Sequence, residues 1–317
     1  MQLLHSNNEF HCQGFGSSRR SDAGGLMRSF GSIIAILVFN FGLNSQSEAK
    51  PLPLDLERAQ KVFDHEANYD FRGIVKLSNC SGSLVRFEGA RDQDPGLILT
   101  NGHCVSGAFG GMMPANEFSY HVPSKRTFQF LAQDGSILPG SVAARELLYA
   151  TITWNDVALY TLEQNYAQIK QKFGVDAIVV NSTRPKLGDP IEILSGYWQQ
   201  GYSCRIDRFV FELREADYVS KDSMRYSKGG CETIHGTSGS PILDPRTRTV
   251  VGINSTGNDS GGHCTMDNPC EVSENGQIYV EKGRSYGDQT HVFYSCLDSS
   301  ARLDLTIEGC RLFHKGE

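Results

Sequence analysis

Short hydrophobic runs, several of them alternating with polar residues, recur along the chain from residue 69 onward. Gly, Asn, Asp and Pro separate them, and none carries a sustained helical period. Such runs predict β-strands joined by tight turns. They include GIVKLS (73–78), GSLVRF (82–87), GLILTNGHCV (96–105), the segment 128–150, DVALYTLE (156–163), and later runs from AIVVN (177–181) to THVFYSC (290–296).

A polar segment near the middle of the chain interrupts this rhythm. Residues 163–176, EQNYAQIKQKFGVD, are compatible with a helix and divide the strands into two β-rich halves, at about 72–165 and about 186–295. We therefore predict an all-β fold of two antiparallel barrels, because closed barrels leave no exposed sheet edges. A tail (296–317) follows the second half.

The N-terminal region has the pattern of a targeting segment. Residues 27–49 combine a positive start, a short apolar centre and a small-x-small exit, which predicts a cleaved signal peptide and no stable membrane anchor. We expect residues 1–26 to be a gene-model extension before a true start at Met27, and residues 50–71 to be a leader or arm. The domain proper is expected at 72–317, in a secreted or periplasmic protein.

Charge and cysteine content narrow the function classes. The net charge of −6 across 317 residues gives no basic footprint for nucleic acid. Of nine cysteines, Cys12 lies in the presumed extension, and the even number that remains fits disulfides in an oxidising compartment. No CxxC pair is present, so we expect no metal site; we also expect no cofactor. The remaining cysteines are Cys80, Cys104, Cys204, Cys231, Cys264, Cys270, Cys296 and Cys310.

Three separate stretches carry candidate chemistry. Ser238 lies in CETIHGTSGSPIL (231–243), which by itself is equally typical of a Gly/Ser turn before a strand. His103 ends an apolar strand beside Cys104, and a Cys80–Cys104 disulfide would make its turn rigid. Asp156 opens an apolar run, where a buried carboxylate needs a hydrogen-bond partner such as a histidine N–H. A serine becomes nucleophilic only with such a base and an orienting acid.

In the order CSGSLV…ILTNGHC, NDVAL and GTSGSPI, these stretches resemble the signatures of trypsin-like (chymotrypsin-fold) serine endopeptidases, across about residues 72–295. The resemblance implies two six-stranded barrels with the active site between them. It implies His103 as general base, Asp156 as its orienting carboxylate and Ser238 as nucleophile, with the N–H groups of Gly236 and Ser238 as oxyanion hole. Ser255, Thr256 and Gly257 would pair with the substrate backbone, and Ser255 would lie near Asp156.

Other positions bear on specificity. Thr237 stands where the animal digestive members carry an aspartate that binds a freed N-terminus, so we expect no activation of that kind. The pattern is closer to bacterial secreted members; Thr233 matches a residue with which their glutamyl endopeptidases bind acidic side chains. Asn254 replaces the pocket histidine of that group. Glu232 falls where trypsins carry the acid at the pocket floor, which would select Arg or Lys, and His235 is expected at the cleft rim.

Two questions stay open at the level of sequence. The later cysteines pair either in sequence (Cys204–Cys231, Cys264–Cys270, Cys296–Cys310) or, as the family's alternative implies, as Cys231–Cys264 with Cys204–Cys270. The function is that of a monomeric enzyme acting on proteins or peptides. The alternatives are an inactive secreted binding protein on the same fold and an esterase that leaves peptides uncut.

Overall fold

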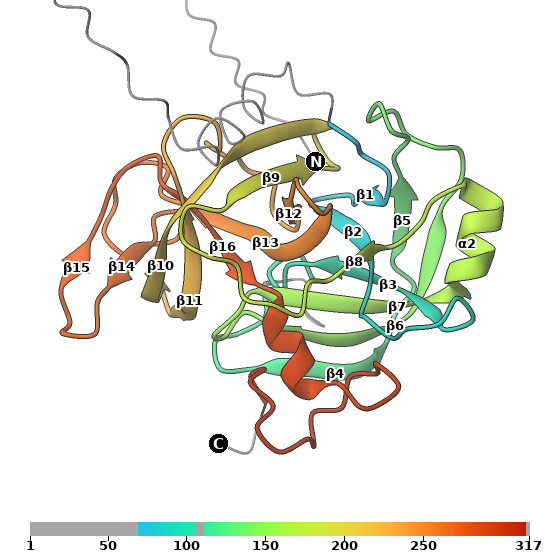
Figure 1. The fold of residues 1–317 in the computed structure, drawn as a ribbon. Helices are drawn as coiled ribbons and strands as arrows, with labels where there is room; N and C mark the ends of the chain where they lie inside the picture. Colours follow the sequence, from blue (N-terminus) through green and yellow to red (C-terminus); the bar gives the residue numbers. More distant parts are fainter. Residues whose placement is uncertain (1–68, 106–110, 315–317) are drawn as a thin grey trace, which may run out of the picture. The chain divides into compact units, whose positions relative to one another are not determined.

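Strands dominate the described part of the chain, residues 69–105 and 111–314 of a computed structural model (Figure 1). The predicted extension (1–26), signal peptide (27–49) and most of the predicted leader (50–71) lie outside the described residues. No helix within the described ranges is long and apolar enough to cross a membrane. The prediction of an all-β fold with two antiparallel barrels is confirmed, as follows.

The first barrel closes because β1 pairs with both β2 and β5. All six neighbouring pairs in its ring are antiparallel. The ring order is β1 (Ile74–Lys76), β5 (Thr127–Phe130), β6 (Val142–Thr151), β7 (Val157–Asn165), β3 (Pro95–Thr100) and β2 (Ser81–Arg86). Outside the ring, β4 (Phe118–Pro123) pairs with β6, and β8 (Ile178–Val179) pairs with β2.

The polar segment between the halves contains a helix, α2 (Tyr166–Phe173), as its composition predicts. A capping box starts the helix: the Asn165 side chain accepts the N–H of Gln168, whose side chain accepts the N–H of Asn165. Gly174 ends it in the left-handed conformation, with φ 68°. This helix packs on the first barrel through buried Tyr166 and Ile169.

The second barrel closes in the same way, through the pairing of β10 with β11. The ring order is β11 (Tyr218–Tyr226), β16 (Ser285–Gln289), β13 (Thr249–Gly257), β12 (Pro241–Asp244), β9 (Pro190–Ser195) and β10 (Gln200–Glu215). A hairpin of β14 (Cys270–Val272) and β15 (Ile278–Tyr279) adds to β10. Both barrels therefore use the six strands that the family resemblance implies.

A shared apolar cluster joins the two barrels and the C-terminal segment. It includes Ile74 and Leu99 of the first barrel, Ile253 of the second, and Phe293 in the 3-10 helix η1 (His291–Cys296). Burial of this much apolar surface is the main force that holds the barrels together. The barrels thus form a fixed base for loops that meet between them.

Four disulfides cross-link the described residues. The cysteines pair in sequence, as Cys80–Cys104, Cys204–Cys231, Cys264–Cys270 and Cys296–Cys310. The alternative with a Cys231–Cys264 bond is therefore wrong. The first two bonds lie next to the histidine turn and to the segment that leads to Ser238.

Candidate active site

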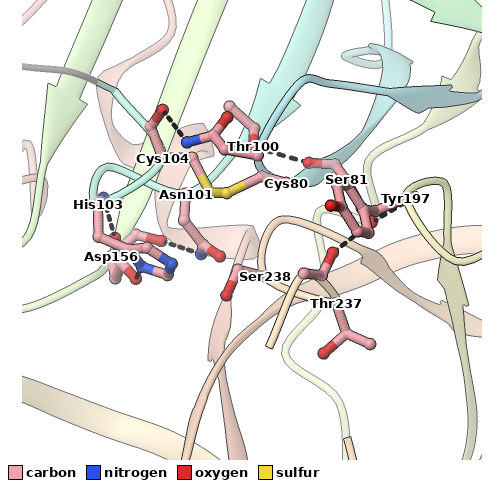
Figure 2. The surroundings of a disulfide bond; sticks show 12 residues. Cys80, Ser81, Thr100, Asn101, His103, Cys104, Asp156, Tyr197, Thr237 and Ser238 are labelled. Atoms are coloured by element: carbon pink, nitrogen blue, oxygen red, sulfur yellow. Dashed lines mark hydrogen bonds and ion pairs between the residues drawn. A yellow bond between two sulfur atoms is a disulfide. The ribbon is translucent and has the colours of Figure 1, made fainter. Parts of the chain in front are cut away.

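The turn that follows β3 holds His103 between the two barrels (Figure 2). The Cys80–Cys104 disulfide fastens this turn to the start of β2. Thr100 adds a second tie, because its Oγ1 donates to the Ser81 carbonyl at 2.8 Å. Arg126 Nη1 donates to the Cys104 carbonyl at 2.6 Å. The histidine is thus carried on a turn with little freedom to move.

Asp156, immediately before β7, holds the imidazole of His103. Its Oδ2 lies 2.5 Å from His103 Nδ1, and its Oδ1 accepts the His103 backbone N–H at 2.9 Å. Ser255 Oγ also donates to Oδ2, at 2.8 Å. The carboxylate is 3% exposed and needs these donors to remain charged. The geometry leaves Nε2 of His103 as the free ring nitrogen.

The electrostatics of His103 and Asp156 favour the charged form of each side chain. Burial alone would raise the pKa of Asp156, but the charge and hydrogen bonds of His103 outweigh burial and the pKa is lowered. Burial alone would lower the pKa of His103, yet Asp156 raises it above its ordinary value. An imidazole with a raised pKa is a stronger base for a proton from a hydroxyl group.

A second carboxylate lies behind Asp156. Asp288 of β16 is 1% exposed; its Oδ2 accepts the Asp156 backbone N–H at 2.7 Å and its Oδ1 accepts Ser223 Oγ at 3.0 Å. Burial and then the charge of Asp156 raise the pKa of Asp288 to about 7, although the N–H bond opposes them. Sequence reasoning missed this residue, because Asp288 follows Asp156 by 132 positions and lies in a strand that carries no motif.

Ser238 lies in a tight turn that requires glycine at two positions. Gly236 and Gly239 have φ of 89° and 80°, and a Cβ on Gly239 would come within 2.2 Å of the Ser81 carbonyl oxygen. The Ser238 hydroxyl donates to the Ser255 carbonyl at 3.4 Å rather than to His103 in the described structure. Ser238, His103 and Asp156 line one cavity.

The predicted oxyanion-hole groups have unused donors. Thr237 N–H donates to the Ile234 carbonyl at 3.0 Å. The N–H groups of Gly236 and Ser238 have no acceptor within the described ranges of the chain. Free, adjacent donors of this kind are what a tetrahedral oxyanion requires.

The cleft wall contains most of the predicted substrate-binding residues. Thr233, His235, Ser255, Thr256 and Gly257 line the cavity. At the end of β13, Thr256 and Gly257 pair with β16 on one side, and the other edge is unpaired among the described residues, as a strand that receives an extended peptide would be. His235, an exposed side chain, contacts Asp259 at 2.9 Å (Nε2 to Oδ2), which fits a place at the rim.

Glu232 is not at the floor of this cavity, and that prediction needs correction. Its side chain is exposed, and its carboxylate accepts the N–H groups of Gly229 and Gly230 at 2.8 and 2.9 Å. These bonds lower the pKa of Glu232. The carboxylate caps the preceding turn because those two donors are only two and three residues away. Charge at this position therefore faces solvent.

The acids that do line the cavity come from segments with no recognisable motif. Besides Asp156, they are Glu215 at the tip of the β10–β11 hairpin, and Asp259 and Asp267 in the loop after β13. Asp267 donates its N–H to Glu215 Oε1 at 2.7 Å. Burial raises the pKa of Glu215, although hydrogen bonds from Thr256 and Asp267 oppose it.

The described residues contain one candidate group for a metal ion. Among the described residues, the one close group of potential metal ligands is Cys80, His103 and Cys104. Its two sulfur atoms are bonded to each other, so they cannot act as thiolate ligands. The side chains present are those of acid–base and nucleophilic chemistry.

Comparison with known proteins identifies a family for this chain. A family model described as a trypsin-like peptidase domain matches residues 80–253, more than half of the chain. No curated relative is found at the level of sequence.

Several solved bacterial structures are similar in fold. The MamO protease domain from Magnetospirillum magneticum is 13% identical, with a TM-score of 0.44, over 72% of this chain and 97% of that one. The thermostable serine protease AL20 from an extremophilic microorganism is 18% identical, with a TM-score of 0.40, over 70% and 92%. A Nocardiopsis protease is 15% identical, with a TM-score of 0.39, over 69% and 92%. These likenesses assign no substrate.

Proposed function

The chain belongs to the trypsin-like peptidase family and is a serine-type endopeptidase that acts on proteins or peptides, and on that premise we propose how it works. Ser238 is the nucleophile, His103 the general base and Asp156 the orienting acid. The observation that carries this assignment is the rigid contact of His103 with Asp156 in the cavity that Ser238 also lines.

The reaction is an acyl transfer in two steps. His103 Nε2 takes the proton of the Ser238 hydroxyl as Oγ attacks the peptide carbonyl carbon, and the N–H groups of Gly236 and Ser238 stabilise the oxyanion. The imidazolium gives its proton to the leaving amine. Water then attacks the acyl-enzyme with the same base, which releases the acid product and restores Ser238.

Secretion and a preference for Arg or Lys belong to the same proposal. The four disulfides support an oxidising compartment, with residues 27–49 as the signal. For the basic preference, the support is now Glu215, Asp259 and Asp267 in the cavity wall rather than Glu232. Their charges would attract a cationic side chain on the acyl side of the scissile bond.

Digestion of a denatured protein tests the function. The full chain, Ser238→Ala and the matched control Ser240→Ala are incubated with the substrate, and every new terminus is mapped by mass spectrometry. Ser240 does not line the cavity. We expect cuts with the full chain and with Ser240→Ala, absent with Ser238→Ala. Cuts shared by all three contradict the nucleophile. Basic residues near the cuts support the cavity acids, and their absence contradicts the preference.

A fluorophosphonate separates the enzyme from a binding protein on the same fold. Acylation of Ser238 is expected in the full chain and not in Ser238→Ala. A folded protein that fails to react is the result that would favour the binding function.

A further inference from the structure

The serine turn has an unusual property: the carbonyl groups of four successive residues are all bound. The donors come from the turn itself, from β2 and from the turn between β9 and β10. They are Trp198 Nε1 to the His235 carbonyl (2.7 Å), Ser81 Oγ to Gly236 (3.0 Å), Ser240 N–H to Thr237 (3.0 Å) and Ser81 N–H to Ser238 (2.8 Å).

These carbonyl contacts fix the directions of the N–H groups. In a planar trans peptide, the C=O of one residue and the N–H of the next point in opposite directions. The His235 carbonyl points to Trp198, so the Gly236 N–H points away from Trp198. The Thr237 carbonyl points to Ser240, so the Ser238 N–H points away from Ser240. Neither of these two N–H groups has an acceptor among the described residues.

The inner side of the turn is held by uncharged groups as well. Thr237 is 1% exposed, and its Oγ1 donates to the Ile234 carbonyl at 2.5 Å. Asn254 Nδ2 donates to the same Oγ1 at 3.1 Å, and Asn254 Oδ1 accepts Tyr226 OH at 3.1 Å. This chain of hydrogen bonds contains no group that titrates near neutral pH. The turn needs no ion pair to keep its shape.

We propose that Trp198 is a positioning residue for the oxyanion hole. Its indole N–H holds the His235–Gly236 peptide in the orientation that directs the Gly236 N–H into the hole before substrate binds. The proposal rests on the proposed acyl-transfer function and extends it to a residue in a separate turn, 38 positions before Gly236 along the chain.

The indole is suited to this role and has little other reason to be there. Its side chain is 48% exposed, so it contributes little to the core. It packs edge-on against Tyr197, with ring centroids 4.9 Å apart, which limits its rotation. The two rings lie close against the turn, because a Cβ on Gly236 would come within 2.8 Å of Tyr197 Cδ1 and 2.9 Å of Trp198 Nε1. Without the indole donor, the His235–Gly236 peptide is free to turn its carbonyl toward the hole and remove one donor.

Replacement of Trp198 tests this. Trp198→Phe keeps an aromatic ring and removes the donor; β-(3-benzothienyl)alanine at position 198 removes only the N–H and keeps the shape. We expect kcat for a peptide substrate to fall about 10- to 100-fold with KM unchanged, less than the loss of a whole oxyanion donor. Affinity for a peptide aldehyde, whose adduct places an oxyanion in the hole, should fall by the same factor. The pH profile and Tm should not move.

The control and the outcomes are as follows. Tyr197→Phe removes the neighbouring hydroxyl, which binds nothing in the described structure, and should behave as wild type. A Trp198 variant with wild-type kcat, or with unchanged aldehyde affinity, overturns the proposal. An increase in KM with no change in kcat overturns it too. The test uses the full chain, after its activity has been shown to depend on Ser238. Absent wild-type activity refutes the proposed function, whereas active Trp198 variants refute only the role of the indole.

Discussion

The two barrels share one topology but differ in what fills them. The interior of the first barrel is apolar, with side chains such as Phe128, Phe130 and Leu84 that are fully buried. The second barrel has a smaller apolar cluster, and charge is buried beside it where the β14–β15 hairpin adds to β10: Arg225, Glu271 and Arg284 are less than 10% exposed. Arg225 bonds both Asp207 and Glu271, at 2.6 and 2.9 Å.

The difference follows from what each barrel has to hold. The first barrel only has to present His103 and Asp156 on fixed turns, which an apolar core does well. The second carries the turn of Ser238 and the cavity wall, whose backbone N–H and C=O groups need polar partners. Its interior is therefore polar close to the site, through Asn254, Thr237 and Asp288. The enzyme combines a rigid platform with a polar, shaped binding half.

The largest expected effect tests whether the halves act as one unit. His103→Ala in the first barrel and Ser238→Ala in the second should each lower kcat by about 10⁴- to 10⁶-fold, and the double variant should lose hardly more than one of them. The reason is that, in the proposed mechanism, base and nucleophile act in the same step. Single-turnover assays on a chromogenic peptide measure this. Losses that multiply in the double variant would mean that the two residues act independently.

The interiors should respond differently to mutation. Phe128→Ala in the first barrel should lower the free energy of unfolding by about 3–5 kcal/mol, because a cavity remains where the fully buried ring packed. Urea denaturation measures the change. A loss below 1 kcal/mol would show that the first core is loosely packed.

In the second barrel, the matching experiment removes a buried charge. Arg225→Met should cost about 3–5 kcal/mol, because buried Glu271 loses its ion pair with Arg225 and keeps only the Tyr286 hydroxyl and a 3.8 Å contact with the more exposed Arg208. Adding Glu271→Gln should recover part of that loss, a recovery with no counterpart in the first barrel. If the double variant is less stable than the single, charge is not what makes the interiors differ.

Asp288 gives the second barrel a pH dependence of its own. Its pKa in the folded state, about 7, lies above the unfolded value of about 3.9. The folded protein therefore binds more protons between these values, so the contribution of Asp288 to stability is present below about pH 4 and lost as pH rises toward 7. Asp288→Asn should flatten this part of the Tm–pH curve. Identical curves for wild type and variant would contradict it.

Asp156 changes stability with pH in the opposite direction to Asp288, and His103 is expected to set the pH dependence of activity. The lowered pKa of Asp156 contributes stability above its unfolded value, which is lost as pH falls through the folded one. Because the pKa of His103 is raised, kcat/KM should fall with a midpoint above about 6.5 as pH decreases. A pH–rate profile reports this, and undiminished activity at pH 5 would exclude His103 as the base.

The smallest effect is expected at Glu232. Glu232→Gln should change stability by less than about 1 kcal/mol, since the group is exposed and an amide oxygen still accepts from the turn. The ratio of kcat/KM for Arg and Gln substrates should not change. A matched Glu215→Gln should reduce that ratio. If the ratio falls in Glu232→Gln and not in Glu215→Gln, Glu232 is the specificity residue after all.

The sequence by itself determined the features that are encoded locally. Alternating hydrophobic runs predict strands because side chains in a strand point to opposite faces with a period of two, and α2 follows from its polar run and its cap. The stretches around His103, Asp156 and Ser238 can be recognised because tight turns beside strands restrict which residues fit. The disulfide at the histidine turn follows from the position of its cysteines one hairpin apart.

The tertiary structure alone decided what depends on distant segments meeting. Asp288 and Trp198 reach the site from β16 and from the β9–β10 turn, and Glu215 reaches the cavity wall from a hairpin tip. No spacing along the chain encodes these contacts, because barrel closure sets them. Glu232 shows the converse: its family position suggests the pocket, but two nearby N–H groups bind its carboxylate. A local hydrogen bond costs less chain entropy than a distant one, so the side chain stays at its own turn.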